Sequence, residues 1–232
     1  MKKQSILFLL LITNFVFSQQ SAKVHYKVET DWKLYDSLHS NLNYRNQSKI
    51  LLKKVLNIAQ DLDFYLKFNT NESLYYCEDI MPDETFDMRL YTLAKTLGRG
   101  YAKHYQNKKE NISLHQFIDF SNKKLYREYE KLFINNWKIT KETDTILGYP
   151  VIKAIRGVKE IAWFTPNIPV PFGPGGQGGL PGLILKYKYN FTGIVVTQIF
   201  LYKKPLKIKK PKKGILRTVE EGRVARIKSI NR

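Results

Sequence analysis

The segment WFTPNIPVPFGPGGQGGLPGLILKYKY, residues 163–189, decides how this chain folds. Five of the nine prolines and six of the thirteen glycines lie between residues 166 and 182. Proline cannot donate a hydrogen bond within a β-ladder, whereas glycine permits a positive φ. Because the apolar residues Ile168, Val170 and Phe172 stand among them, we expect a structured loop that packs these side chains back on a sheet, not a disordered linker.

The residues that follow this loop argue against a phosphate-binding loop. Glycines that hold a phosphate open a helix, usually with Lys and then Ser or Thr at its end. Here every second residue from Leu183 to Tyr189 is Leu or Tyr, and the residues between them are Ile184, Lys186 and Lys188. This is the period-two pattern of a strand. We therefore predict that the loop joins two adjacent strands, one with Trp163 and the other with Leu183.

Period-two segments typical of strands occupy most of the remaining chain. They are residues 22–30, 101–107, 112–120, 123–133, 136–144, 149–157, 159–166, 182–190 and 191–204. Residues 64–76 predict a hairpin and residues 48–62 an amphipathic helix. Residues 78–100 suggest a long connection with at most one helical turn, and residues 218–228 a short helix capped by Thr218. The predicted fold is mainly β (α+β), a curved antiparallel sheet or open half-barrel with one or two packed helices.

The first residues, MKKQSILFLLLITNFVFSQQ, have the pattern of a secretory signal peptide. Lys2 and Lys3 precede a short apolar run, and we expect residues 1–18 to be removed. The alternative, a retained N-terminal anchor, is disfavoured because the run is too short and interrupted for a bilayer about 30 Å thick. Residues 19–232 then suffice for a single domain, and none of their segments reads as a membrane-spanning helix. We expect the protein in the periplasm, at the cell surface or secreted.

The chain is strongly basic, with a formal net charge of +19. In a cytosolic protein such a charge would suggest nucleic acid, but export replaces that partner with anionic lipid or polysaccharide. Much of the excess lies in a basic C-terminal arm at about residues 202–217, for which we expect a solvated, extended conformation. The candidate anionic-surface contacts are Lys207, Lys209, Lys210, Lys212 and Lys213.

No catalytic constellation is visible in the sequence. Cys77 is the only cysteine, and a half-buried strand position is favoured over a catalytic thiol. The four histidines, His25, His39, His104 and His115, have no dense ligand spacing and are interpreted as surface or strand residues. No cofactor or metal is therefore predicted. The tyrosines of the strands are explained better by ordinary strand propensity than by the lining of a binding groove. The second interpretation is kept as an alternative.

The segment AWFTPNIPVPFGPGGQGGLPGLILKY, together with ETDTILGYPVIKA before it, resembles the GLPGLI family of secreted proteins from Bacteroidetes. The matching motif residues are Trp163, Phe164, Thr165, Pro166, Ile168, Pro169, Gly173, Pro174, Gly178, Gly179, Leu180, Pro181, Gly182, Leu183, Ile184 and Leu185. Relatives often carry Cys after the Gly-Tyr turn, where this chain has Pro150 and Val151, so a thiol-based role is not expected here. The resemblance implies export and a β-rich fold, and it transfers no catalytic residue.

Three functions from different classes are considered, and the first two are favoured. The first is a non-enzymatic binding or carrier protein of the cell envelope, for a lipid-like or small ligand, with the loop at residues 163–182 as its rim or lid. The second is an interaction or scaffold protein that docks on an envelope partner or anionic surface through the basic arm. An enzyme is the third and least favoured possibility, because a sheet can still gather distant carboxylates.

Overall fold

A computed structural model describes residues 21–39, 46–80, 87–132 and 136–230. The predicted signal peptide, residues 1–18, lies outside the described residues. The strands are β1 Ser21–Thr30, β2 Phe64–Phe68, β3 Glu72–Cys77, β4 Lys103–Asn107, β5 Ile112–Ile118, β6 Leu125–Lys131, β7 Lys138–Ile146, β8 Tyr149–Arg156, β9 Glu160–Thr165, β10 Leu183–Tyr189, β11 Thr192–Tyr202 and β12 Ile215–Thr218. The helices are α1 Trp32–His39, α2 Asn46–Asp61, α3 Met88–Leu97 and α4 Val219–Ile230, with a single 3-10 turn, η1, at Pro174–Gly176.

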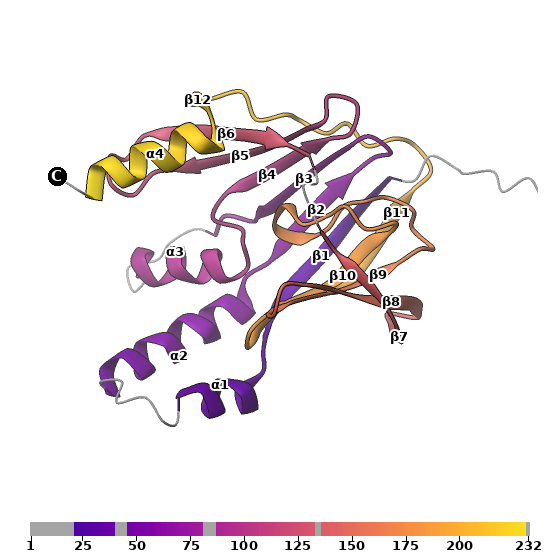
Figure 1. The fold of residues 1–232 in the computed structure, drawn as a ribbon, viewed down its shortest axis with the longest axis horizontal. Coiled ribbons are helices and arrows are strands. Elements are labelled where there is room, and N and C mark those ends of the chain that lie inside the picture. The colour runs from indigo at the N-terminus through magenta and orange to yellow at the C-terminus, as the bar shows by residue number, and fades with distance from the viewer. Residues whose placement is uncertain (1–20, 40–45, 81–86, 133–135, 231–232) are drawn as a thin grey trace, which may run out of the picture.

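In the described part of the chain the strands form one twelve-stranded sheet that does not close into a barrel. The order is β12-β6-β5-β4-β3-β2-β1-β11-β10-β9-β8-β7, and Figure 1 shows it as a curved, open surface. The strand β1 lies in the middle and pairs with both β2 and β11, so it joins the two halves of the sheet. The predicted fold class, mainly β with a curved open sheet, is confirmed.

One face of the sheet carries the main core. Along β1, Ala22, Val24, Tyr26 and Val28 are buried, while the residues between them are partly exposed. The helices α2 and α3 pack together and contribute apolar side chains to this core, α2 lying against β1. The amphipathic helix predicted for residues 48–62 and the hairpin at 64–76 are confirmed.

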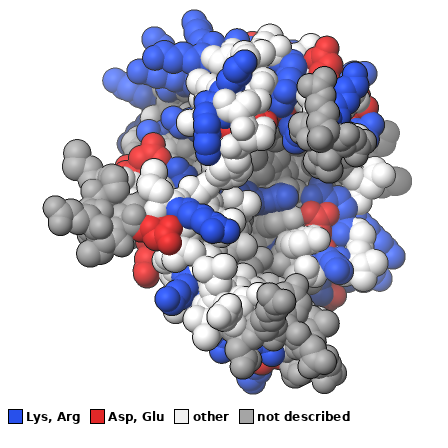
Figure 2. Space-filling view, turned by 90° about the vertical axis from the view of Figure 1, so that its left-hand side faces the viewer, with Lys and Arg blue, Asp and Glu red and all other residues white. Residues whose placement is uncertain are grey.

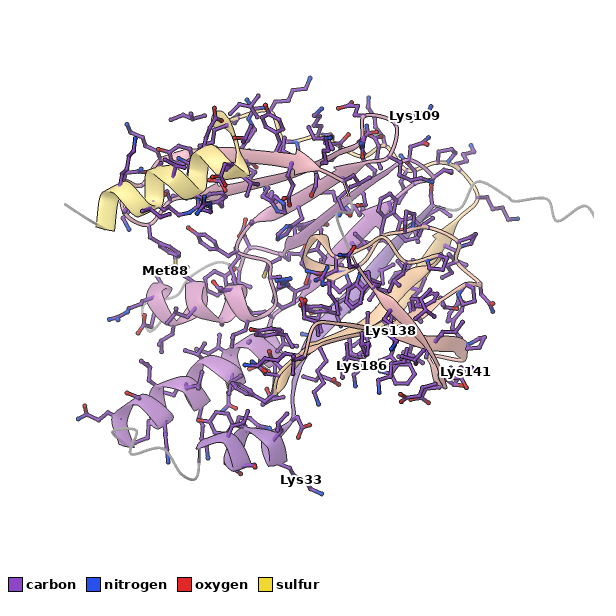
Figure 3. All side chains as sticks on the ribbon, in the orientation of Figure 1. Lys33, Met88, Lys109, Lys138, Lys141 and Lys186 are labelled. Atoms are coloured by element: carbon purple, nitrogen blue, oxygen red, sulfur yellow. The ribbon has the colours of Figure 1, made fainter. Side chains whose placement is uncertain are left out.

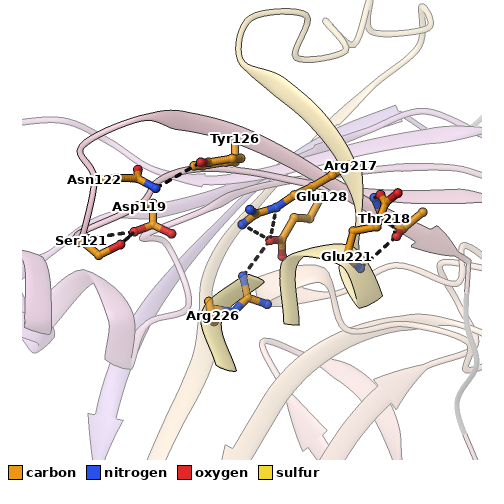
Figure 4. A network of polar contacts seen from close by, with 9 residues as sticks. All are labelled: Asp119, Ser121, Asn122, Tyr126, Glu128, Arg217, Thr218, Glu221 and Arg226. Carbon is orange, nitrogen blue, oxygen red and sulfur yellow. Dashed lines mark hydrogen bonds and ion pairs between the residues drawn. The ribbon is translucent and has the colours of Figure 1, made fainter. Parts of the chain in front are cut away.

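The C-terminal helix α4 is held on the same face by an ion-pair network, shown in Figure 4. Glu128 of β6 is 5% exposed and accepts hydrogen bonds from Arg217 at 2.6 Å and Arg226 at 2.7 Å. The backbone N–H of Thr218 donates to the Glu221 carboxylate at 2.7 Å, and the Glu221 N–H donates back to the Thr218 hydroxyl at 3.1 Å. This reciprocal pair is the capping box that the sequence predicts.

The basic arm is packed along the sheet, which corrects the expectation of a solvated segment. Residues 203–214, here called the strap, lie over the opposite face of the sheet. Leu206 and Ile208 of the strap join Tyr105 and Leu114 in a second, smaller apolar cluster. The Ser21 hydroxyl accepts from the Leu206 N–H at 3.1 Å. The two apolar residues among the lysines account for the difference, because their burial offsets the cost of ordering a charged segment.

Two further expectations are corrected. Residues 88–97 form a ten-residue helix, α3, where the sequence suggested at most one helical turn. Asp87 caps it by accepting from the N–H groups of Arg89 and Leu90, and Tyr91 and Ala94 are buried. The strand β12 pairs with β6 in parallel, whereas only antiparallel pairs were expected. None of the described helices has the length and apolar character to span a bilayer.

Candidate functional site

The motif loop, residues 166–182, is an ordered excursion that crosses the core face of the sheet. It leaves β9 and returns into β10, and these strands are antiparallel neighbours, as the sequence predicts. Ile168, Val170 and Phe172 are buried, so the prediction that they pack back on the sheet is confirmed. The Gly179 N–H donates to the Pro171 carbonyl at 3.0 Å, which ties the two sides of the loop together.

The tip of the motif loop reaches strands far along the sheet. The turn η1 contacts β3 and β4, which are separated from β9 by four and five intervening strands of the sheet. The Gln106 side chain donates to the Gly176 carbonyl at 2.8 Å, and the Trp137 indole donates to the Gly178 carbonyl at 3.0 Å. The motif loop therefore links the two arms of the curved sheet across its open side.

Glycine is required at this tip. Gly175 and Gly176 have φ of 60° and 75°. A Cβ on Gly175 would lie 2.5 Å from Arg99 side-chain atoms, and one on Gly176 would lie 2.9 Å from the His104 ring. The sequence GPGG thus brings backbone into direct contact with an arginine and a histidine.

A groove runs beside this contact, between α3 and the motif loop. One part has a volume of about 480 Å³, and the adjoining part has a volume of about 420 Å³. Thr96 and Arg99 line both parts, so the two parts of the groove meet at these residues. Figure 2 shows this side of the molecule hollowed between the elements at the top, which include α4, and the helices below.

Arg99 brings a positive charge into the groove, where it helps to lower the pKa of Glu160. Its guanidinium carbon lies 5.2 Å from the centre of the Tyr187 ring. Among the residues that the structure describes, none forms an ion pair with Arg99. Arg99 also has a φ of 57°, so its backbone is held in the left-handed region at the end of α3.

Across the groove, the charge of Arg156 is compensated. Its guanidinium donates twice to the Glu160 carboxylate, at 2.7 Å and 2.8 Å, and also to the Gln177 side chain at 2.6 Å. The Tyr187 hydroxyl donates to the same carboxylate at 2.5 Å. The Arg156 guanidinium and this hydroxyl hold the pKa of Glu160 below its usual range, whereas burial raises the pKa of Tyr187 to about 12.

Two histidines form a hydrogen-bonded pair in the groove. His104 Nε2 lies 2.8 Å from the Arg99 carbonyl, which can only accept, so Nε2 carries a proton. His104 Nδ1 lies 2.7 Å from His115 Nδ1, which therefore donates to it. Burial, followed by the neighbouring His115, lowers the pKa of His104 well below its usual range. The Glu130 carboxylate, 3.4 Å from His115 Nε2, has a lowered pKa because of that contact.

None of the motif residues named from the sequence lines the groove, although they belong to the segment that forms one of its walls. Gly178 accepts from Trp137 behind the groove wall, and Gly182 lies against the Thr165 backbone. The lining includes Gly175, Gly176 and Gln177, within the motif loop. These three residues were not nominated from the sequence. Neither were the other lining residues, which include Arg99, His104, His115, Glu130, Arg156, Glu160 and Tyr187.

Cys77, His25 and His39 are not among the residues that line the groove. Cys77 is buried in β3, and burial raises the pKa of its thiol to about 12, so the thiol stays protonated at neutral pH. His25, His104 and His115 are strand residues, as predicted, and His39 is the last residue of α1. In the described ranges no three His, Cys, Asp or Glu side chains are arranged to hold a metal ion.

The strap lysines lie on the other face of the sheet. Lys207, Lys209, Lys212 and Lys213 are exposed. Within the described residues, Lys210 is the one member of the predicted set in an ion pair, with Glu110 at 2.5 Å. Figure 3 shows that other lysines, among them Lys33, Lys109 and Lys138, project from separate parts of the molecule, so basic charge is not confined to the strap.

Comparison with known proteins agrees with the position of the motif. A family model described as "Protein of unknown function (Porph_ging)" matches residues 156–186, from the end of β8 into β10. This interval contains Arg156, Glu160 and the whole motif loop. No curated protein matches the chain.

Two solved structures of PNGF-II share the fold. The structure in the C2 space group has a TM-score of 0.55 and 19% identity, and it covers 90% of this chain and 33% of that chain. The structure in the P21 space group has a TM-score of 0.57 and 20% identity, over 91% of this chain and 34% of that chain. The chain thus spans about a third of the length of PNGF-II, and at this identity the likeness is one of fold.

Proposed function

We propose that this protein is an exported, non-catalytic binding protein of the cell envelope whose ligand site is the groove between α3 and the motif loop. The observation that carries the proposal is the close contact of Gly175 and Gly176 with Arg99 and His104. The most distinctive segment of the sequence therefore forms one wall of a polar groove, in which no described residue forms an ion pair with Arg99.

The size and lining of the groove favour a small ligand over a lipid-like one. The part beside the histidines is lined by Arg99, Arg156, Glu130 and the two histidines, which suit polar groups. Ligand sites usually occupy about 300–1,000 Å³ and have a few placed polar groups, a range that includes each part of this groove. A long acyl chain would have to pass these charged side chains.

The arrangement of hydrogen bonds favours binding over catalysis. A general base needs a nitrogen or oxygen that can reach the substrate. Both ring nitrogens of His104 and of His115 have protein partners. Glu160 is similarly occupied by Arg156 and Tyr187. These contacts support the proposal of a binding protein, and the leader-like residues 1–18 support export.

The proposal is tested by ligand occupancy. The mature protein is purified from its host and examined by native mass spectrometry, beside Thr96→Trp and Thr92→Trp. Thr96 lines both parts of the groove, whereas Thr92, one turn earlier on α3, faces a different surface. We expect a small co-purifying molecule on the wild type and on Thr92→Trp but not on Thr96→Trp.

Two results would remove the proposal. One is a wild-type protein that is consistently empty and whose mass and melting temperature do not change when envelope extract is added. The other is a ligand that Thr96→Trp retains as fully as Thr92→Trp does.

A second function, docking on an anionic surface through the strap, has its own support. An ordered basic segment loses little conformational entropy on binding, and four of the five nominated lysines are exposed. Replacing Lys207, Lys209, Lys210, Lys212 and Lys213 by Gln should abolish retention on envelope fractions at low salt. The control removes five exposed lysines elsewhere, namely Lys33, Lys54, Lys138, Lys141 and Lys159. Equal loss in both variants would show only an effect of net charge, and unchanged retention would exclude the strap.

A further inference from the structure

We propose that the ligand of the groove carries a single carboxylate, which binds Arg99. This inference rests on the proposed function and adds the chemical class of the ligand.

The first argument is the preorganisation of Arg99. Its carbonyl accepts the His104 Nε2 proton at 2.8 Å, and its side chain lies directly against Gly175. The guanidinium lies over the Tyr187 ring. These contacts restrict the side chain before any ligand arrives, so less conformational entropy is lost on binding. A planar guanidinium held in this way matches the two oxygens of a carboxylate.

The second argument is the charge balance of the groove. The charge of Arg156 is compensated by Glu160, and Glu130 lies beside His115. Among the described residues that line the groove, Arg99 is thus the cation without a direct ion pair, although its charge also acts on Glu160. Two carboxylates, Glu130 and Glu160, line the same groove. A phosphate monoester carries a charge of about −1.5 to −2 at pH 7 and would bring excess negative charge near them. One carboxylate neutralises Arg99 without that repulsion.

The third argument is the character of the groove on the other side of Arg99. That part is lined by Leu97, Tyr187, Tyr189 and Ile194, so it offers apolar and aromatic surface next to the cation. A ligand with a carboxylate at one end and a flat or aliphatic body can occupy both environments at once. This arrangement is the reason for testing aromatic acids first.

The experiment uses three probes with the same ring, namely benzoate, phenyl phosphate and benzamide. Binding is followed by two-dimensional ¹⁵N NMR of the arginine Nε–H signals of the mature protein at pH 7.5. The Arg99 signal is assigned as the one missing from Arg99→Met. We expect benzoate to shift this signal. Its affinity should exceed that of phenyl phosphate and of benzamide by about ten-fold or more, which is the gain of a hydrogen-bonded charge pair.

Matched variants separate the role of Arg99 from a general loss of charge. Arg99→Met should weaken benzoate binding by about ten-fold or more. Arg89→Met removes an exposed arginine from the first turn of the same helix, outside the groove, and should leave benzoate binding unchanged. If Arg99→Met does not fold, the ranking of the three probes on the wild type decides the question alone.

Several outcomes would overturn the inference. They are tighter binding of phenyl phosphate or benzamide than of benzoate, equal benzoate binding to the wild type and Arg99→Met, and no benzoate binding at all. A natural ligand that is lost from Thr96→Trp but kept by Arg99→Met would refute the carboxylate while leaving the groove as the binding site. Empty protein together with no probe binding would refute both proposals.

Discussion

Gly182 shows how a single hydrogen atom in place of a side chain sets the geometry of the motif loop. A Cβ at this position would lie 2.1 Å from the backbone oxygen of Thr165 and 2.6 Å from its carbonyl carbon. Backbone of the adjacent strand cannot rotate away as a flexible side chain can. The glycine is therefore needed for close approach of the two chain segments at the base of the loop.

We predict that Gly182→Val loses folding yield before any binding function is affected, and that Gly182→Ala lowers the free energy of unfolding by about 3 kcal/mol or more. The control is Gly148→Ala, where φ is +77° and nothing lies within 4 Å of the added Cβ. Strain alone should cost that variant about 1–2 kcal/mol. Urea unfolding measures the free energy of unfolding of Gly182→Ala and of Gly148→Ala. A Gly182→Val protein that folds normally but no longer binds its ligand would instead make this position part of the functional site.

His104 couples the stability of the fold to pH. Its pKa is well below that of an unfolded histidine, near 6.5, because it is buried beside His115 and close to Arg99. As the pH falls below about 6.5 the unfolded chain therefore binds a proton that the folded chain does not. Stability from this residue is complete above that pH and declines as the pH drops toward the folded pKa.

The test compares the wild type with His104→Gln between pH 8 and pH 5. We expect the variant to be less stable at pH 8, because the bond to Arg99 is weakened. It should also lose less stability on acidification, with a difference in slope of up to about 1.4 kcal/mol per pH unit. Parallel stability profiles for the two proteins would contradict this account.

At the scale of an element, α4 depends on one buried carboxylate. Glu128 accepts from both Arg217 and Arg226. A Cβ on Gly222 of α4 would lie 1.9 Å from the Glu128 carboxylate. Glycine within a helix is unfavourable by about 1 kcal/mol relative to alanine. In the folded protein the same glycine lets α4 approach β6 closely enough for the network to form.

We predict that Glu128→Gln frees α4 and β12 from the edge of the sheet. Removal of one partner of a buried ion pair costs up to about 3–5 kcal/mol, and here the cost arises from Arg217, which is mostly buried, whereas Arg226 is exposed. Hydrogen exchange of the α4 amides should accelerate while exchange in β1 and β10 stays unchanged. Glu220→Gln breaks an exposed pair with Arg223 and should leave exchange of the α4 amides nearly unchanged. Wild-type exchange of α4 in Glu128→Gln would rule out this role.

At the scale of the whole molecule, the motif loop makes the open sheet behave as one unit. Phe172 is fully buried in the main core, and its ring lies 6.3 Å from that of Phe68 in β2. The loop that carries Phe172 begins and ends in β9 and β10, on the other arm of the sheet. Packing across the open side therefore couples the two arms.

Phe172→Ala should accordingly destabilise the entire sheet by about 3–5 kcal/mol. Unfolding followed by tryptophan fluorescence and by far-ultraviolet circular dichroism should give coincident transitions for the wild type. The matched control is Leu201→Ala, since Leu201 is 55% exposed, and its effect should stay within about 0.5 kcal/mol. A change confined to one arm of the sheet, with separate transitions, would mean that the loop does not couple the arms.

Some elements were predictable because the signals for them are local. The alternation in β1, the 3.6-residue spacing in α2 and the capping box of Thr218 and Glu221 depend on neighbours a few residues away. The helix α3 was missed because its apolar stripe is short, with only Tyr91 and Ala94 buried. The strap was misjudged because seven lysines dominate its composition, and the burial of Leu206 and Ile208 depends on a sheet face that composition does not reveal.

By itself, the sequence determined the class of fold, most of the strands and the existence of a rigid loop between β9 and β10. Proline and glycine restrict the backbone, and side-chain periodicity selects the buried face, wherever the chain then goes. Only the tertiary structure decided that Arg99, His104, Arg156 and Tyr187 share one groove. They come from α3's end, β4, β8 and β10, and their approach depends on the curvature of the sheet and on the reach of the motif loop across it. Non-local contacts of this kind leave no pattern in the sequence that surrounds each residue.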